Sequence, residues 1–130
     1  MKYKAEWWSI DVSPEWEVSE DAECTSFFAS PQLGVLQVSA ARKPTGNVTK
    51  EDIAEFAYDG QIPSEAIHPV SAAHASGLYA EYEEAGHYWR QWWLKGKSVL
   101  VFVTYNVGQE YKDSERAAVD ALISSLRITA

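Results

Sequence analysis

The sequence predicts an α+β domain built on an antiparallel sheet. A nearly unbroken run of strand-forming residues covers 78–107 and is divided by two glycine-containing turns. Because glycine permits such backbone reversals, this run predicts a three-stranded antiparallel meander. Apolar residues at helical spacing stand at 53–57 and at 119–126. Strands, a helix, more strands and a closing helix predict two main helices packed on the sheet.

The N-terminal third predicts strands separated by proline-containing turns. The first strand alternates apolar and polar residues and ends at Pro14. Two later strands form an antiparallel pair across a turn at Pro31. The second of this pair is apolar on both faces, which is typical of an interior strand. The strands expected here are 4–12, 16–18, 23–29 and 33–42.

A helix is predicted to begin at Thr49. Asp52 stands three positions later, which is close to the spacing of a capping box. Ile53, Phe56 and Ala57 then form a single apolar stripe at i, i+3 and i+4, and Gly60 with Pro63 ends the helix.

The remaining elements complete the sheet and close the fold. His68-Pro69 makes 66–73 an edge strand or a loop, because proline cannot donate to a strand ladder. The last meander strand, 98–106, is apolar on both faces and is expected at the centre of the sheet. Asp113 or Ser114 then caps the final helix. Its apolar stripe is Val119, Leu122, Ile123 and Leu126.

Length and cysteine content bound the class of protein. The chain of 130 residues predicts a single domain, 1–130, that needs no disulfide or metal staple. Cys24, the single cysteine, cannot form an internal disulfide, and its acidic neighbours should raise the pKa of its thiol. We expect it to be buried and structural. No apolar run resembles a leader or a membrane span, so a soluble cytoplasmic protein is expected.

A net charge of −8 disfavours nucleic acids and anionic membranes as partners. The acidic residues gather at 15–23 and in a second group formed by Glu81, Glu83 and Glu84. Two interpretations stay open: a solvated face that keeps the protein soluble, or a docking surface for a basic protein.

The polar residues form no recognisable catalytic or metal-binding motif. His68 and His74 lack the helical spacing of a zinc pair, and the seven glycines stand singly, unlike those of phosphate-binding loops. His87 follows Glu83 and Glu84 across a tight turn, where an imidazole–carboxylate contact is expected to be an ordinary surface pair. No catalytic residue, metal ligand or cofactor is therefore predicted.

Six tryptophans raise the aromatic content to 13%. In the strand 87–94, Trp89 and Trp93 share one face with His87 and Gln91. Most tryptophans are expected in the core, and the alternative is a partly exposed aromatic groove for a peptide or an apolar ligand. The candidate binding residues are Trp89, Trp93, His87, Glu81, Glu83 and Glu84.

Four features extend over nearly the whole chain: Ser13-Pro14-Glu15-Trp16, the strand 33–42 ahead of a helix, the late meander, and the closing 123–127. In these features the plan resembles the Mog1/PsbP-like superfamily, although that family often has glycine where this chain has Glu15. The resemblance implies an α/β/α sandwich that serves mostly as a non-catalytic binding scaffold. Its members include a nuclear-transport regulator, a photosystem subunit, and bacterial chaperones and adaptors.

The sequence thus predicts a non-enzymatic protein-binding module, of the kind found in bacterial adaptors, chaperones or immunity-type proteins. The alternative is a small-ligand binding protein with a pocket lined by tryptophan and tyrosine. A third class is an enzyme that uses His87 with Glu83 or Glu84, which requires these groups to converge in a cleft.

Overall fold

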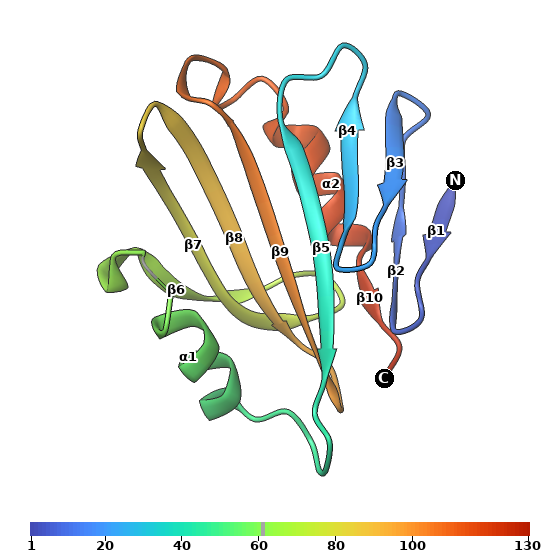
Figure 1. Cartoon of the computed structure of the whole chain (residues 1–130), viewed down its shortest axis with the longest axis vertical. Coiled ribbons are helices and arrows are strands. Elements are labelled where there is room, and N and C mark those ends of the chain that lie inside the picture. The colour runs from blue at the N-terminus through green and yellow to red at the C-terminus, as the bar shows by residue number, and fades with distance from the viewer. Residues whose placement is uncertain (61) are drawn as a thin grey trace.

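The computed structural model describes residues 1–60 and 62–130, which form an α+β fold with two antiparallel sheets and two α-helices (Figure 1). The larger sheet has the order β3 (Trp16–Glu20), β4 (Thr25–Ala29), β5 (Val35–Arg42), β9 (Val99–Gly108), β8 (His87–Lys95), β7 (Ser76–Glu84) and β6 (Ile67–Ser71). The smaller sheet consists of β1 (Lys2–Lys4), β2 (Trp8–Asp11) and β10 (Arg127–Ile128). The helices are α1 (Lys50–Tyr58) and α2 (Arg116–Ser125), with short 3₁₀ turns η1 (Ser64–Ala66) and η2 (Gln109–Tyr111).

The predicted meander is formed by β7, β8 and β9. The β7–β8 hairpin turns at Ala85 and Gly86, whose φ angles of 52° and 79° are both positive. Two consecutive residues with positive φ are typical of a type I′ turn, which matches the twist of the strands that it joins. Strand β9 lies fourth of seven in the sheet, so the prediction of a central position is confirmed. Strand β6 is an edge strand, as its proline predicts.

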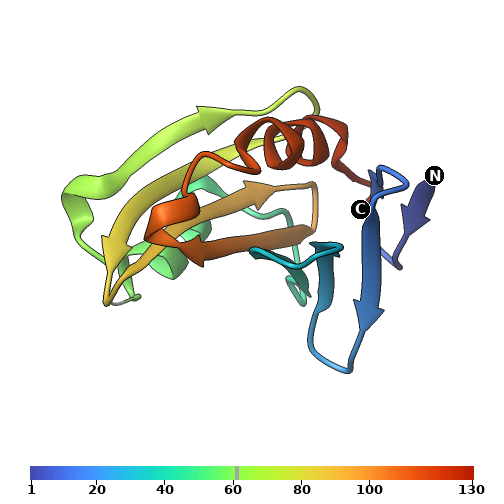
Figure 2. The ribbon, with the colours of Figure 1, turned by 90° about the horizontal axis from the view of Figure 1, so that it is seen from above.

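The two helices lie on opposite sides of the larger sheet (Figure 2). Helix α2 and the smaller sheet cover one face, where the main core includes Trp92, Val101, Val103 and Leu122. Helix α1 covers part of the other face, where a smaller core includes Trp93. Within 1–60 and 62–130, neither helix is long and apolar enough to cross a bilayer.

The N-terminal segment departs from the single strand predicted over 4–12. Ala5 N–H donates to the carbonyl of Trp8 at 2.8 Å, and the chain reverses there to form the β1–β2 hairpin. The prediction of one continuous strand was wrong because this turn contains neither glycine nor proline. The apolar alternation still reports the buried face correctly, since Trp8, Ile10 and Val12 are all in the core.

Helix α1 begins as predicted, and only part of its apolar stripe is buried. Thr49 and Asp52 form a complete capping box. Ile53 and Ala57 are buried, but 46% of Phe56 is exposed. Phe56 lies at the edge of the stripe, where its ring contacts Phe102 of the sheet and stays partly exposed.

Helix α2 buries its predicted stripe but begins later than predicted. Neither Asp113 nor Ser114 is its cap: Glu115 occupies the N-cap position, and its side chain makes no capping hydrogen bond. The Glu115 carboxylate instead turns inward, where Oε1 accepts from the Tyr105 hydroxyl at 2.7 Å and from Gly34 N–H at 3.2 Å. This buried cluster joins α2, the central strand β9 and the start of β5.

Only glycine fits at position 34 in this cluster. A Cβ at Gly34 would lie 2.7 Å from the Tyr105 hydroxyl and 2.7 Å from the Asn106 carbonyl oxygen. These distances are below any normal contact, so only glycine allows the chain to approach Tyr105 and donate to Glu115. Burial raises the pKa of Tyr105, and the adjacent Glu115 carboxylate raises it further, so the phenol stays a donor.

We expect Tyr105→Phe to lower the free energy of unfolding by about 1–3 kcal/mol, because it leaves a buried carboxylate oxygen with one donor fewer. Urea unfolding followed by fluorescence measures this change. Tyr111→Phe is the control, since that ring is 45% exposed and should change stability little. Equal stability of the two variants would show that the cluster does not stabilise the fold.

Candidate functional site

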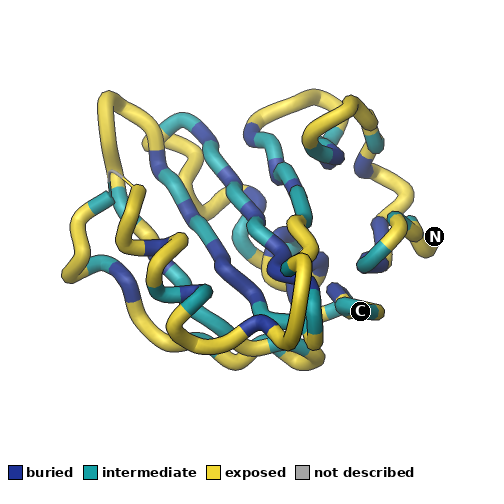
Figure 3. Tube along the Cα trace, turned by 60° about the horizontal axis from the view of Figure 1, so that its bottom comes forward, coloured by how far each residue is buried: buried dark blue, intermediate teal, exposed yellow. Residues whose placement is uncertain are grey.

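The face of the sheet that carries α1 is only partly covered. Pairing across the strands places Tyr82, Trp89, Asn106 and Val35 in one row on this face. All four are half-buried, whereas their neighbours on the opposite face are mostly buried, and Figure 3 shows this alternation along the strands. We call this row and the next one, which contains Gln91, Thr104, Gln37 and Ser26, the open face.

The β7–β8 hairpin divides the six candidate binding residues between the two faces of the sheet. Glu84 pairs with His87, and Tyr82 pairs with Trp89, so these residues share the side of the open face. Glu83 and Glu81 pair with Tyr88 and Arg90 on the opposite side. The structure therefore brings His87, Trp89, Trp93 and Glu84 to one face and Glu81 and Glu83 to the other.

An aromatic groove of about 280 Å³ lies between α1 and the hairpin. Trp93, 2% exposed, stacks on Phe102 with ring centroids 5.8 Å apart, and Phe102 contacts Phe56 at 5.4 Å. At the other end, Tyr82 stacks on Trp89 with their planes 7° apart. The groove is lined by Phe56, Gly60, Ile62, Tyr82, Glu84, Gln91, Trp93 and Phe102.

Two polar groups define the chemistry of the groove. The Gln91 amide donates to the Tyr82 hydroxyl at 2.8 Å and fixes that ring against Trp89. The Glu84 carboxylate is exposed and makes no hydrogen bond or ion pair with any residue in the described ranges. The groove thus combines aromatic walls with one available carboxylate, which suits a cation on an apolar stem.

Glu81, on the opposite face, is engaged within the protein. Its Oε1 accepts from the Tyr79 hydroxyl at 2.6 Å and from the Arg116 guanidinium at 2.8 Å. Partial burial alone would raise the pKa of Glu81, but these hydrogen bonds outweigh it and lower the pKa to about 2. This carboxylate holds α2 against β7 and is less available to a partner.

Glu83 and His87 are both exposed to solvent near the hairpin turn, on opposite faces of the sheet. Glu83 accepts from the Gln109 amide at 3.0 Å and lies 3.8 Å from the Lys112 ammonium. Glu83, Glu84 and His87 are all exposed, so they do not converge in a cleft of the kind that an acid–base pair needs. Among the described residues, no three His, Cys, Asp or Glu side chains are placed to hold a metal ion.

Arg90 is the centre of a second polar cluster, beneath α2. It is 6% exposed, donates to Tyr79 at 2.7 Å and to Asp120 at 2.6 Å, and stacks on the ring of Trp92. Burial opposes its charge, but the hydrogen bonds with Tyr79 and Asp120 prevail and raise the pKa of Arg90. One guanidinium nitrogen, Nη1, is buried with no partner in the part of the chain that the structure describes.

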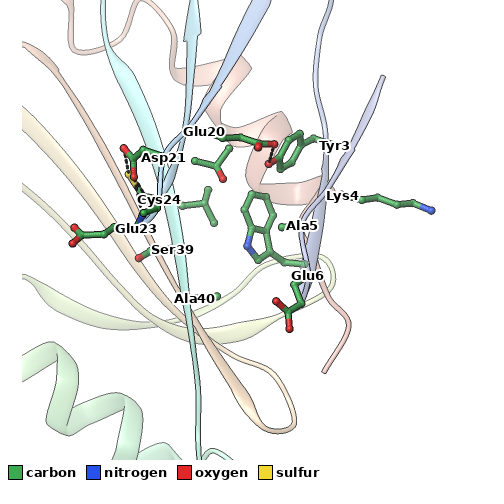
Figure 4. Close-up of a pocket in the computed structure, with 14 residues that line it drawn as sticks. Tyr3, Lys4, Ala5, Glu6, Glu20, Asp21, Glu23, Cys24, Ser39 and Ala40 are labelled. Atoms are coloured by element: carbon green, nitrogen blue, oxygen red, sulfur yellow. Dashed lines mark hydrogen bonds between the residues drawn. The ribbon is translucent and has the colours of Figure 1, made fainter.

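The first acidic group partly surrounds a cavity of about 440 Å³ between the smaller sheet and the β3–β4 turn (Figure 4). Two of the carboxylates beside it are engaged locally: Glu20 accepts from Tyr3, and Asp21 accepts from the backbone N–H groups of Glu23 and Cys24. Cys24 stands in this turn and is half-buried. The predicted rise in its thiol pKa is confirmed, with burial the larger cause and the Asp21 charge the next.

Comparison with solved structures identifies the fold. A crystal structure from Bacteroides thetaiotaomicron matches 95% of this chain with a TM-score of 0.74 at 16% identity, although the chain spans only 46% of that protein. The solution structure of PsbP (CyanoP) from the cyanobacterium Synechocystis matches with a TM-score of 0.67 at 11% identity, covering 98% of this chain and 91% of the other. LpqN of Mycobacterium tuberculosis, which is involved in cell envelope biogenesis, matches with a TM-score of 0.63 at 11% identity, covering 95% and 83%.

The chain has a PsbP-like fold, so the predicted resemblance to the Mog1/PsbP-like superfamily is confirmed at the level of structure. No protein-family model and no curated protein matches the sequence. At these identities the likeness concerns the fold and does not transfer a site.

Several residues of the groove were not predicted from the sequence. Phe56, Phe102 and Gln91 were not among the candidates. A usable signal was present for Tyr82, because a two-residue turn at Ala85-Gly86 fixes the register and places Tyr82 opposite Trp89. Contacts between α1 and β9 have no such signal, since they depend on how the helix docks.

Glu81 predicts a pH dependence of stability. Its pKa is about 2 in the folded protein against a usual 4.5, so its contribution is complete above about pH 4.5 and is lost as the pH falls toward 2. We expect acid unfolding of Glu81→Gln to show a shallower loss of stability over this window than the wild type.

Two further variants test the assignment to this carboxylate. Arg116→Gln should remove much of the same pH dependence, and the double variant should add little to either single change. Glu84→Gln removes one carboxylate that has no internal partner and serves as the control. Denaturant unfolding at several pH values measures the free energy of unfolding. If this free energy falls equally with pH in Glu81→Gln and in wild type, the role of Glu81 is contradicted.

Proposed function

We propose that this chain is a non-catalytic protein-binding module that receives a basic side chain of its partner in the aromatic groove. The observation that carries the proposal is the Glu84 carboxylate beside a groove walled by Tyr82, Phe56 and Phe102. Aromatic faces attract a guanidinium or ammonium group, the walls accept its alkyl stem, and the carboxylate pairs with the charge.

The open face supports a protein as the occupant. Tyr82 and Trp89 are of the residue types enriched at the energetic centres of interfaces, and they stand half-exposed beside the groove. The amide and hydroxyl groups of Gln37, Thr104 and Asn106 can supply hydrogen bonds around them. A net charge of −8 would favour the encounter with a basic partner and orient it.

The fold is consistent with this class of function. We take its layers to be the α/β/α sandwich of the PsbP-like type, a scaffold on which function lies in surface sites. All three compared structures come from bacteria, and we propose a bacterial adaptor, chaperone or immunity-type protein. The cytoplasm is the proposed compartment, on the basis of the single cysteine.

A second candidate function is the binding of a small cationic ligand in the same groove. The groove volume of about 280 Å³ lies just below the range of roughly 300–1,000 Å³ for ligand pockets, which suits only a small ligand. The two functions differ in what they need: a small ligand uses the groove alone, whereas a protein also covers the open face.

Short peptides with blocked ends test the proposal directly. A peptide with a central arginine should bind and change tryptophan fluorescence, and the same peptide with citrulline should bind about tenfold more weakly, because it keeps the shape and loses the charge. The affinity of the arginine peptide should fall as salt rises, since exposed charges are screened beyond about 8 Å at physiological ionic strength.

Matched variants locate the binding. Glu84→Gln should weaken binding of the arginine peptide about tenfold and leave the citrulline peptide unchanged. Glu51→Gln removes the same charge from the exposed side of α1, outside the groove, and should change neither affinity. Equal binding of the two peptides to wild type, or no effect of Glu84→Gln, would refute the proposed recognition. Asn106→Arg on the open face should abolish capture of a native protein partner while sparing a small ligand.

A further inference from the structure

A second cleft of about 480 Å³ lies on the other side of α1, between the helix and the β6–β7 edge of the sheet. It shares no lining residue with the aromatic groove. Ile53, Ala54 and Tyr58 turn toward the cleft, whereas Phe56 turns toward the groove. The cleft is lined by Lys50, Ile53, Ala54, Tyr58, Pro69, Val70, Ser76, Gly77, Leu78 and Lys95.

Most residues that line this cleft are apolar, and the charged ones are two lysines, Lys50 and Lys95, with no Asp or Glu in the lining. The whole chain has 19 acidic residues against 11 lysines and arginines, so a lining with two lysines and no carboxylate reverses the general charge of the surface. The apolar side chains of the lining include Ile53, Ala54 and Leu78. The volume lies inside the range of roughly 300–1,000 Å³ that small-molecule sites occupy.

Both lysines stand toward the same end of the cleft. Lys50 is the first residue of α1, and Lys95 is the last residue of β8, where it pairs with Ser76. Val48 N–H donates to the Lys97 carbonyl at 2.8 Å, which holds the start of α1 beside the end of β8. Tyr58, the last residue of α1, marks the opposite end.

Neither lysine is neutralised within the protein. Across 1–60 and 62–130, the ion pairs involve Lys43, Lys112, Arg90 and Arg116, and no side-chain hydrogen bond involves Lys50 or Lys95. Two uncompensated ammonium groups at one end of an apolar cleft favour an anion at that end.

Two small residues line the cleft. Gly77 cannot carry a side chain, because its Cβ would lie 1.8 Å from the Trp93 carbonyl oxygen. Ala54, half-buried on α1, faces the cleft with a methyl group only. A larger residue at Ala54 would therefore fill the space without disturbing the strands.

We propose that this cleft binds a single-chain alkyl carboxylate of the fatty-acid class. The alkyl chain lies along α1 against Ile53, Ala54 and Leu78, and the carboxylate lies between Lys50 and Lys95. The apolar walls account for the chain and the paired ammonium groups account for the head, since a neutral or cationic head gains nothing from them. This site is separate from the groove proposed to bind a partner, and it does not depend on that proposal.

Calorimetric titration of the full chain with dodecanoate, below its micellar concentration, tests the site. We expect saturable binding of dodecanoate and binding of dodecan-1-ol about tenfold weaker. The double variant Lys50→Gln/Lys95→Gln should lose about tenfold in affinity for dodecanoate and leave dodecan-1-ol unchanged. Ala54→Phe should abolish binding of both ligands, because the ring occupies the place of the alkyl chain.

Lys97→Gln is the matched control, since Lys97 is exposed nearby and does not line the cleft. It should bind dodecanoate as the wild type does, and so should Glu84→Gln, which separates this test from that of the groove. In wild type, dodecanoate should shift the amide resonances of Ala54, Val70 and Leu78 and not that of Trp89, a result that needs no variant to fold. Absence of saturable binding, equal affinity for the alcohol, or shifts confined to the groove would overturn the assignment.

Discussion

The larger sheet is wider than the helix that lies on one of its faces, and the surface features of the protein follow from this mismatch. Seven strands at about 4.8 Å spacing span roughly 29 Å, whereas the nine residues of α1 extend about 14 Å. The opposite face is covered by α2 and the smaller sheet together, so most residues in the middle of that face are buried. On the other face, α1 alone is too short to cover the sheet. The open face, the aromatic groove and the second cleft are what it leaves exposed.

The short helix also separates two binding environments of opposite character. Phe56 closes the groove toward Phe102 and the hairpin, where the available charge is the Glu84 carboxylate. Ala54, two positions earlier, faces the cleft, where the charges are ammonium groups. Because successive residues of a helix point in different directions, one helix docked on half of a face is enough to form both walls. No strained or buried reactive group is needed for either site, which is consistent with a binding scaffold.

The parts of the fold that could be predicted from the sequence are those that depend on the spacing of apolar residues and on short turns. The meander, the central β9 and the buried stripe of α2 were predictable because strand alternation, the Ala85-Gly86 turn and the helical repeat are local signals. The cap of α2 was not, because Glu115 is held inward by hydrogen bonds from Tyr105, 10 residues earlier, and from Gly34, 81 residues earlier, and no local signal reports these contacts. The split of the first strand lacked a turn residue to mark it. The groove was half predictable: strand register gives Tyr82 and Trp89, but the position of Phe56 depends on helix docking.

The two proposed sites are too far apart to influence each other through charge. Strand β8 runs from His87, beside Glu84, to Lys95, so its ends are separated by about 26 Å at 3.3 Å per residue. Exposed charges are screened within about 8 Å at physiological ionic strength, so an anion at Lys95 does not change the potential felt by Glu84. Any coupling must therefore be mechanical, through α1, β7 or β8, which line both sites. Strands β7 and β8 are held by their pairing in the sheet, so α1 is the element that can shift. A rigid α1 leaves the sites independent, whereas displacement of the helix by an alkyl chain would move Phe56 and reshape the groove.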